Sequence, residues 1–211
     1  MEVPGAPSSS WPMLEVLALD CYHTSVIPGS PAVILDFGAH VGSASLALHR
    51  IFPAVRIFCY EPSPATARFL RRNLSANGVT AEIHELVVAG RDGHAFLATD
   101  VAASSQAFLH SSGLKGTPVQ VSSFDHAIEA LGLGPVLLKL DCEGSEFGIL
   151  EQSSRPSFLN VQTVLLEYHP PGDYGRVSAA LERFGFDELW HDPDPIHKGL
   201  GLSCWFRPKP A

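Results

Sequence analysis

Short apolar runs alternate with helix-like patterns along most of the chain, and this alternation limits the folds that the chain can adopt. Five runs have the length and composition of buried strands, at 32–37, 55–60, 81–88, 136–140 and 161–167. Amphipathic stretches that predict helices lie between them, for example at 43–51 and 64–76. Strands that alternate with helices indicate an α/β fold, in which helices cover both faces of a mostly parallel sheet.

Other segments depart from this alternation. Short alternating pieces separated by Gly and Ser fill residues 90–121 and predict a small β-hairpin insertion. The stretches 186–190 and 202–206 predict a final pair of strands. The ends, 1–12 and 207–211, are rich in Pro, Ser and Ala and are expected to be flexible. A length of 211 residues favours a single domain over 1–211.

Composition narrows the possible partners. The chain has 14 Lys and Arg against 22 Asp and Glu, a net charge of −8, which disfavours nucleic acid or an anionic membrane as the main partner. No apolar run is long enough to cross a bilayer, and Met1–Pro12 contains no basic residue. The four cysteines form no CxxC pair and are expected to be reduced. We therefore expect a cytoplasmic protein that acts on a small molecule.

A glycine-containing loop follows the first expected strand. Gly38 and Gly42 open a helix, whose N-terminus favours a negative group. The dinucleotide pattern G-x-G-x-x-G would need glycines where the chain has His40 and Ser43, and this disfavours a nicotinamide-dependent oxidoreductase. The strand ends at Asp36, an acid that would repel a pyrophosphate and attract an ammonium or sulfonium group. The pattern fits S-adenosylmethionine, with its carboxylate on the helix N-terminus.

An acid also ends the second expected strand. Glu61 lies 23 residues after Gly38. A carboxylate at this place can accept both hydroxyls of a ribose. Glu61 alone does not separate the nucleoside of S-adenosylmethionine from that of NAD, and a solvated acid at a strand end is an open alternative.

The fourth expected strand leads into an acid-rich segment. Lys139 and Asp141 point to the same side by strand alternation. A lysine in an otherwise apolar strand must be paired, so we expect an ion pair of Lys139 with Asp141 or Glu167. Glu143 follows as a candidate site residue, and Glu146, on the next helix, is expected to be structural.

The fifth expected strand ends in a carboxylate and a histidine, Glu167 and His169, which share a face. A histidine readily takes a proton near neutral pH and could act as the base for a hydroxyl nucleophile. A histidine that caps the strand and bonds the backbone is the alternative. Asp141 and Glu143, with Glu167 or His169, could also hold Mg²⁺, which we do not favour.

Six segments occur in a recognisable order between residues 32 and 170: VILDFGAHVG, YEPSP, LRRNLSANG, VSSFDHAIEAL, LLKLDCEGSEFGIL and LLEYHP. Together they resemble the FkbM family of S-adenosylmethionine-dependent methyltransferases. The usual forms in that family are close to D-x-G-A-N-x-G, E-P-x-P, N-G, K-x-D-x-E-G-x-E and E-x-H. His40 stands where the family usually has asparagine.

The resemblance implies the class I methyltransferase fold, which is Rossmann-like and has a seven-stranded, mostly parallel sheet with an antiparallel last strand. It implies methylation of a hydroxyl oxygen on a small molecule, sugar or lipid. By position, the residues expected at the cofactor are Asp36, Gly38, Ala39, His40, Gly42 and Glu61, with Val88 and Ala89 beside the adenine. The candidate catalytic residues are Lys139, Asp141, Glu143 and His169.

The expected reaction is an in-line transfer in which the acceptor oxygen attacks the sulfonium methyl group. Asp36→Ala should then lower cofactor affinity, and His169→Ala should lower turnover more than cofactor binding. Only about thirty residues precede the first strand, so the substrate cover could come from the insertion or from a second subunit of a homodimer. A non-catalytic, regulatory protein with the same fold and cofactor is the remaining alternative.

Overall fold

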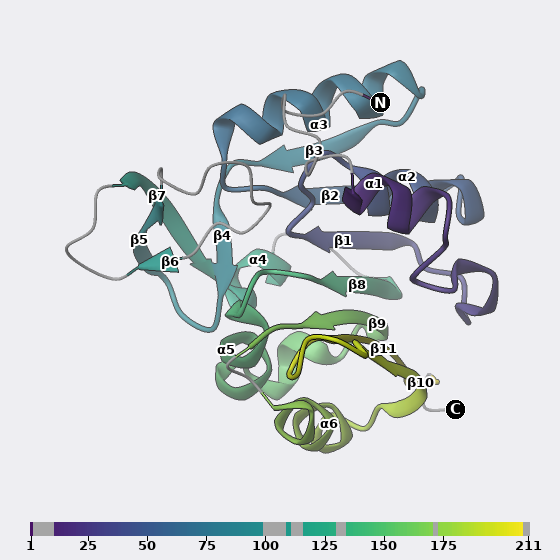
Figure 1. Ribbon diagram of the computed structural model, residues 1–211. Helices are drawn as coiled ribbons and strands as arrows, with labels where there is room; N and C mark the ends of the chain where they lie inside the picture. The colour runs from purple at the N-terminus through teal and green to yellow at the C-terminus, as the bar shows by residue number, and fades with distance from the viewer. Residues whose placement is uncertain (2–10, 99–108, 111–115, 130–133, 171–172, 209–211) are drawn as a thin grey trace.

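The computed structural model describes residues 1, 11–98, 109–110, 116–129, 134–170 and 173–208. Its main sheet has seven strands in the order β10-β11-β9-β8-β1-β2-β3 (Figure 1). The strands are β1 (Val33–Phe37), β2 (Arg56–Tyr60), β3 (Ala81–His84), β8 (Val136–Leu140), β9 (Val161–Tyr168), β10 (Asp187–Pro193) and β11 (Gly201–Phe206). Neighbours from β3 to β9 are parallel, and β11 is antiparallel to both β9 and β10. The expected seven-stranded sheet with an antiparallel last strand is confirmed.

Helices cover both faces of this sheet (Figure 1). They are α1 (Trp11–Leu17), η2 (Thr24–Val26), α2 (Ser43–Ile51), α3 (Pro64–Ala76), α4 (Phe124–Glu129), α5 (Ser145–Gln152), η3 (Arg155–Phe158) and α6 (Tyr174–Arg183). Successive β1 residues point to opposite cores: Ile34 packs with residues of α1, α2 and α3, and Leu35 packs with residues of α4, α5 and α6. Among the described residues, no helix is long and apolar enough to cross a membrane.

The expected single strand at 81–88 is wrong, because the chain forms two strands there. β2 ends at Tyr60, which pairs with His84, so the main sheet offers no partner beyond that point. The chain turns and forms β4 (Val87–Ala89) in a second sheet, where Val87 pairs with Val121. That sheet has the order β4-β7-β5-β6 and contains β5 (Gly93–Ala98), β6 (Leu109–His110) and β7 (Gly116–Ser123). The β-hairpin insertion is thereby confirmed, although residues 106–108 of an expected piece lie outside the described ones.

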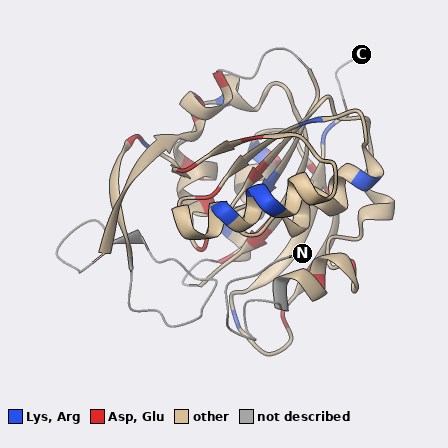
Figure 2. Ribbon diagram, turned by 90° about the horizontal axis from the view of Figure 1, so that it is seen from above, with Lys and Arg blue, Asp and Glu red and all other residues tan. Residues whose placement is uncertain are grey.

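Helix α3 begins and ends as its sequence predicts. Ser63 is the N-cap and accepts a hydrogen bond from the backbone N–H of Thr66 at 3.3 Å, and Pro64 opens the first turn. The turn after the helix uses Gly78 at φ +71°. Figure 2 views the molecule over α3 and shows its arginines in blue; all three are exposed. The cap fixes the start of α3 directly after Glu61, which matters for the site below.

The C-terminal strand is anchored by an arginine that sequence reasoning placed in a flexible end. Arg207 donates hydrogen bonds to the carbonyls of Phe184 at 2.6 Å and Val161 at 2.9 Å, and also to that of Phe158. The expectation of flexibility is wrong for this residue, because backbone acceptors at the ends of η3 and α6 converge on one guanidinium. Residues 209–211 lie outside the described part of the chain.

Arg207→Ala is expected to lower the free energy of unfolding by about 2–3 kcal/mol, since it leaves several half-buried carbonyls without a charged donor. Urea unfolding at neutral pH measures the loss. Arg68→Ala, on the exposed face of α3, is the control and should change stability by less than about 0.5 kcal/mol. Equal effects of the two substitutions would contradict the anchoring role.

Candidate active site

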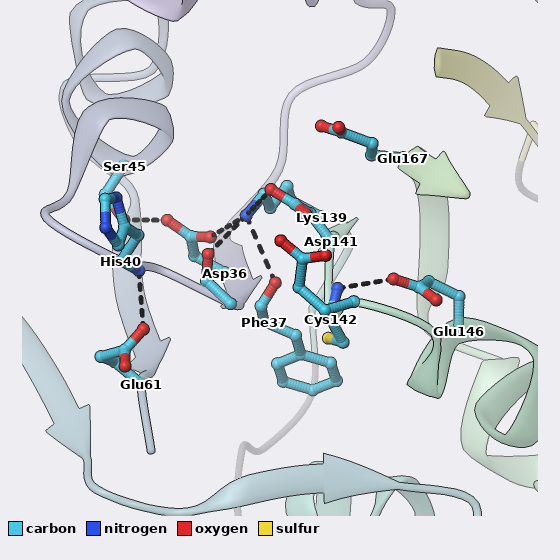
Figure 3. Close-up of polar contacts among 12 residues, drawn as sticks. Asp36, Phe37, His40, Ser45, Glu61, Lys139, Asp141, Cys142, Glu146 and Glu167 are labelled. Carbon is cyan, nitrogen blue, oxygen red and sulfur yellow. Dashed lines mark hydrogen bonds and ion pairs between the residues drawn. The ribbon is translucent and has the colours of Figure 1, made fainter. Parts of the chain in front are cut away.

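The polar candidate residues gather at the carboxyl ends of β1, β2, β8 and β9, and Figure 3 labels six of them: Asp36, His40, Glu61, Lys139, Asp141 and Glu167. The backbone N–H groups of Gly38 and Ala39 both donate to the carbonyl of Tyr60 at 3.1 Å, which ties the loop after β1 to the end of β2. The N–H of Asp141 donates to the carbonyl of Phe37 at 3.2 Å, which ties the end of β8 to the same loop. In an open α/β sheet this edge is where ligands bind.

Glycine is required at both ends of the loop after β1. Gly38 has φ +76°, and a Cβ atom there would lie 1.8 Å from the carbonyl oxygen of Asp141. Gly42 has φ +93°, caps α2, and would place a Cβ atom 2.9 Å from a methyl carbon of Leu70. The loop therefore needs its glycines for packing and conformation, and it leaves the N-terminus of α2 without a side-chain cap.

His40 occupies a left-handed position in the same loop, at φ +48°. Asparagine and histidine adopt this conformation more readily than most residues, so the departure from the asparagine usual in the FkbM pattern preserves the backbone. Its Nδ1 is buried without a hydrogen-bond partner, and burial lowers the pKa of the ring. The lowered pKa favours a neutral imidazole, which has one unsatisfied nitrogen beside the glycine loop.

Glu61 links the loop after β1 to the start of α3. Its Oε2 accepts from the N–H of His40 at 3.0 Å, and its Oε1 accepts from the N–H of Ser63 at 2.8 Å. The residue is 7% exposed, and burial raises the pKa of its carboxyl to about 7 against the lowering effect of these two N–H groups. Each oxygen keeps a second acceptor site, which is what a pair of ribose hydroxyls requires.

Asp36 and Lys139 form the buried centre of the site. The Nζ of Lys139 lies 3.2 Å from Asp36 Oδ1 and 3.1 Å from Asp141 Oδ2, and it donates to the carbonyl of Gly38 at 2.7 Å. Asp36 Oδ2 also accepts from the hydroxyl of Ser45 at 2.6 Å. Burial lowers the pKa of Lys139, but the carboxylates of Asp141 and Asp36 outweigh it and raise that pKa well above its ordinary value. The expected pairing of Lys139 with Asp141 is confirmed.

The structure corrects the expected orientation of Asp36. The sequence predicts that this acid faces a cationic ligand, but its side chain is fully buried between Lys139 and helix α2. Both oxygens of the Asp36 carboxylate face protein groups, Lys139 and Ser45, and not the space in front of the loop after β1. The side chain of Asp36 is thus placed to hold Lys139 and helix α2 in position.

His169 lies at the centre of four carboxylates, and we call these five residues the His169 cluster. Its Nε2 is 3.8 Å from Asp141, 3.5 Å from Glu143 and 3.6 Å from Glu167, and its Nδ1 is 3.1 Å from Glu146. Burial lowers the pKa of His169, but the hydrogen bond to Glu146 and the neighbouring carboxylates raise it to about 9. The raised pKa favours a protonated ring at neutral pH, which disfavours the expected role of His169 as the base.

Two carboxylates of the His169 cluster have pKa values near neutral pH, so they can accept a proton there. Burial, more than the neighbouring charges, raises the pKa of Glu143 to about 7 and that of Glu167 to about 8. Glu143 also has φ +52°, an unusual backbone conformation for a non-glycine residue. Strain of this kind persists where the surroundings impose it, often at functional sites. A base is most effective when its pKa lies near the working pH, and the raised pKa values bring both carboxylates into that range.

Glu146, expected from the sequence to be structural, also contacts the candidate catalytic histidine. The residue is fully buried in the first turn of α5, and its carboxylate contacts the turn 142–144 as well as His169. The available signal was its position two residues after Gly144, where a carboxylate can fold back onto the N–H groups that precede a helix. The sequence gives no indication of the contact between Glu146 and His169, because these residues are 23 apart in the chain.

Among the described residues, Asp141, Glu167 and His169 could together offer one ligand atom each to a metal ion, with these atoms within 4.8 Å of one another. Carboxylates meet in this way in many proteins without an ion. A Mg²⁺ role has no further support here. Val88 and Ala89 lie on β4, where Val88 is 3% exposed and packs into the core, so only the half-buried Ala89 borders open space.

The free energy of unfolding should fall as pH rises, because several groups of this site hold protons more tightly in the folded state. Burial raises the pKa values of Glu61, Glu143 and Glu167 from 4.5 to about 7, 7 and 8, and that of His169 rises from 6.5 to about 9. The folded state then holds more protons than the unfolded state between about pH 5 and 9, so the free energy of unfolding decreases through this range. Urea unfolding at a series of pH values measures it. Glu167→Gln should flatten the slope, and a rise in stability over this range would contradict the argument.

This fold and this arrangement of loops define a class I methyltransferase. Residues 36–188 match the methyltransferase FkbM domain, and the chain belongs to this family. Methyltransferase sdnD of Sordaria araneosa is 24% identical in an alignment of 210 residues. The match covers 82% of this chain and 80% of the relative. The family match shows that the protein is a methyltransferase, and it argues against the alternative of a nicotinamide-dependent oxidoreductase.

Solved structures show the same fold. A methyltransferase FkbM from Methylobacillus flagellatus superposes with a TM-score of 0.62 at 13% identity, over 87% of this chain and 45% of that chain. A precorrin-6y C5,15-methyltransferase from Geobacter metallireducens gives a TM-score of 0.52 at 13% identity, over 90% and 87% of the two chains. The chain spans less than half of the Methylobacillus protein, so activities of that whole protein do not transfer to it.

Proposed function

We propose that the protein uses S-adenosylmethionine to methylate a hydroxyl oxygen of a small-molecule acceptor. The residues present fit this cofactor. The unsatisfied Nδ1 of His40 and the uncapped N-terminus of α2 suit a polar, partly anionic end, and Glu61 has spare acceptor sites for hydroxyls. When bound, S-adenosylmethionine supplies a methyl group on a positively charged sulfur.

The observation that carries the choice of a hydroxyl acceptor is the pair of partly exposed carboxylates with raised pKa values. Glu143 and Glu167 are 20% and 29% exposed in their side chains and have pKa values of about 7 and 8. A hydroxyl must lose its proton as its oxygen attacks, and a carboxylate with such a pKa can take that proton at neutral pH. We assign this role to Glu143, because its strained backbone fixes it beside His169.

The other cluster residues support that carboxylate. The raised pKa of His169 favours an imidazolium, which offsets the negative charge around Glu143, and Asp141 joins the ring to Lys139. Lys139 in turn holds the carbonyl of Gly38, so the acid-rich edge and the cofactor loop keep one relative position. Positioning of this kind can supply up to about 7–11 kcal/mol of a reaction barrier.

Glu143→Gln is expected to lower kcat by about 10²–10⁴-fold while the Kd for S-adenosylmethionine stays unchanged. In the unsubstituted enzyme kcat should fall as pH decreases through about 7, because protonation of Glu143 removes the base. Single-turnover methyl transfer gives the rate and calorimetry gives the Kd. Glu82→Gln, at an exposed acid on β3, is the control. If kcat survives in Glu143→Gln and collapses in Glu167→Gln, the base is Glu167.

Calorimetric titration with S-adenosylmethionine and S-adenosylhomocysteine tests the cofactor directly. Binding of both, unchanged by Mg²⁺ or EDTA, is the expected result, and screening of hydroxyl acceptors follows. Cofactor binding without transfer to any hydroxyl acceptor would favour the non-catalytic, regulatory alternative. Loss of binding in EDTA would make the cluster of Asp141, Glu167 and His169 a metal site.

A further inference from the structure

Glu146 makes three contacts from a fully buried position. Its Oε1 accepts from the N–H of Cys142 at 2.7 Å, and its Oε2 accepts from the N–H of Gly144 at 2.8 Å. The same Oε1 lies 3.1 Å from Nδ1 of His169 (the link to Cys142 is drawn in Figure 3). The residue is 0% exposed. One side chain therefore joins the turn after β8 to the end of β9.

These contacts fix the state of the His169 ring. Both oxygens of Glu146 face N–H donors, an arrangement that suits an ionised carboxylate, which only accepts hydrogen bonds. Nδ1 of His169 must then carry a proton and donate to Oε1. This donation turns Nε2 toward Asp141, Glu143 and Glu167, the side on which the acceptor would be deprotonated.

The same contacts fix Glu143. Its neighbours in the chain, Cys142 and Gly144, are the two residues whose N–H groups Glu146 binds. The carboxylate of Glu146 thus spans the residue with φ +52° and holds it in its strained conformation. A capping role would need only these two backbone bonds. The third contact, to the side chain that directly follows β9, serves no purpose in starting α5.

We propose that Glu146 is a positioning residue for methyl transfer, which holds the His169 ring and the Glu143 carboxylate in one fixed arrangement. The inference rests on the proposed function for its kinetic consequence, and on the described contacts for its structural one. Glu146 is too deeply buried to touch the acceptor itself.

Glu146→Gln preserves the shape of the side chain but presents an NH₂ group to one of the N–H donors. We expect kcat to fall about 10- to 100-fold, the usual effect of losing a partner that orients a reacting group. The Kd for S-adenosylmethionine and the KM for the acceptor should change by less than about twofold, since binding groups stay in place. Glu151→Gln is the matched control: it makes the same change on the same helix, at an exposed acid paired with Arg176, and should leave all three constants unchanged.

Nitrogen-15 NMR of the His169 ring gives a readout that does not depend on activity. In the unsubstituted protein Nδ1 should be protonated and hydrogen-bonded, and in Glu146→Gln that hydrogen-bonded signal should be lost. An unprotonated Nδ1 in the unsubstituted protein would overturn the proposal even if Glu146→Gln does not fold. An unchanged ring signal in a folded Glu146→Gln protein, or an unchanged kcat, would overturn it as well.

The two proposals fail in different ways. If the unsubstituted protein binds S-adenosylmethionine but transfers no methyl group to hydroxyl acceptors, the proposed function fails while the NMR result still decides the coupling of Glu146 to His169. If Glu146→Gln and His169→Gln each lower kcat, the loss in the double variant should be smaller than the product of the two single losses, because the two substitutions remove a shared interaction. Multiplied losses in the double variant would mean that Glu146 acts independently of His169.

Discussion

Lys139→Met should remove about 3–5 kcal/mol from the free energy of unfolding, a large part of the stability of a domain of this size. Lys139 is 2% exposed, and its ammonium group balances the carboxylates of Asp36 and Asp141. Methionine fills the space but leaves the fully buried Asp36 without a counter-charge. The carbonyl of Gly38 also loses its donor. Urea unfolding at neutral pH, with circular dichroism to confirm the fold, measures the loss.

The double variant Asp36→Asn with Lys139→Met separates charge from packing. Asparagine removes the buried negative charge, so the double variant should be more stable than Lys139→Met alone. A double variant that is no more stable would mean that the lysine acts through its packing, contrary to the argument from charge.

Gly38→Ala is expected to cost about 3–5 kcal/mol, from the strain of a side chain at positive φ and from the displacement of a neighbouring backbone. The added methyl group would lie 1.8 Å from the carbonyl oxygen of Asp141, a rigid backbone atom. The loop after β1 and the turn after β8 would have to separate. Urea unfolding gives the stability, and calorimetry should show weaker binding of S-adenosylmethionine.

Gly78→Ala provides the matched control. Gly78 has φ +71°, close to the +76° of Gly38, but nothing lies within 4 Å of an added Cβ atom there. Its cost should be the conformational strain alone, about 1–2 kcal/mol. The difference between the two variants then measures the overlap with Asp141. Equal costs would show that the loop moves aside freely.

Much of the fold could be predicted from local pattern. The strand around Lys139 is a short apolar run, Pro64 follows a good N-cap, and Gly78 ends a helix, so each element is encoded within a few residues. The break at Glu85 was not predictable in this way, because it depends on where β2 stops offering hydrogen-bond partners.

In the candidate site, too, local sequence predicts some features, and contacts between distant segments decide the others. Residue type and strand alternation placed Asp141 and His169 at one edge of the sheet. The raised pKa of His169 and the full burial of Asp36 could not be predicted, because they depend on distances between elements far apart in the chain. The contact of Glu146 with His169 could not be predicted for the same reason, because His169 lies 23 residues away, directly after β9.

The central strands β1 and β8 can be used to measure the free energy of global unfolding by hydrogen exchange. Every residue of β1 and β8 is buried, and each of these strands is paired on both sides, whereas β10 lies at an edge with mostly exposed or half-buried residues. Amide hydrogens of β1 and β8 can exchange with solvent only when the whole sheet comes apart. Their exchange rates would therefore report the free energy of global opening, while those of β10 would report local fraying at the edge.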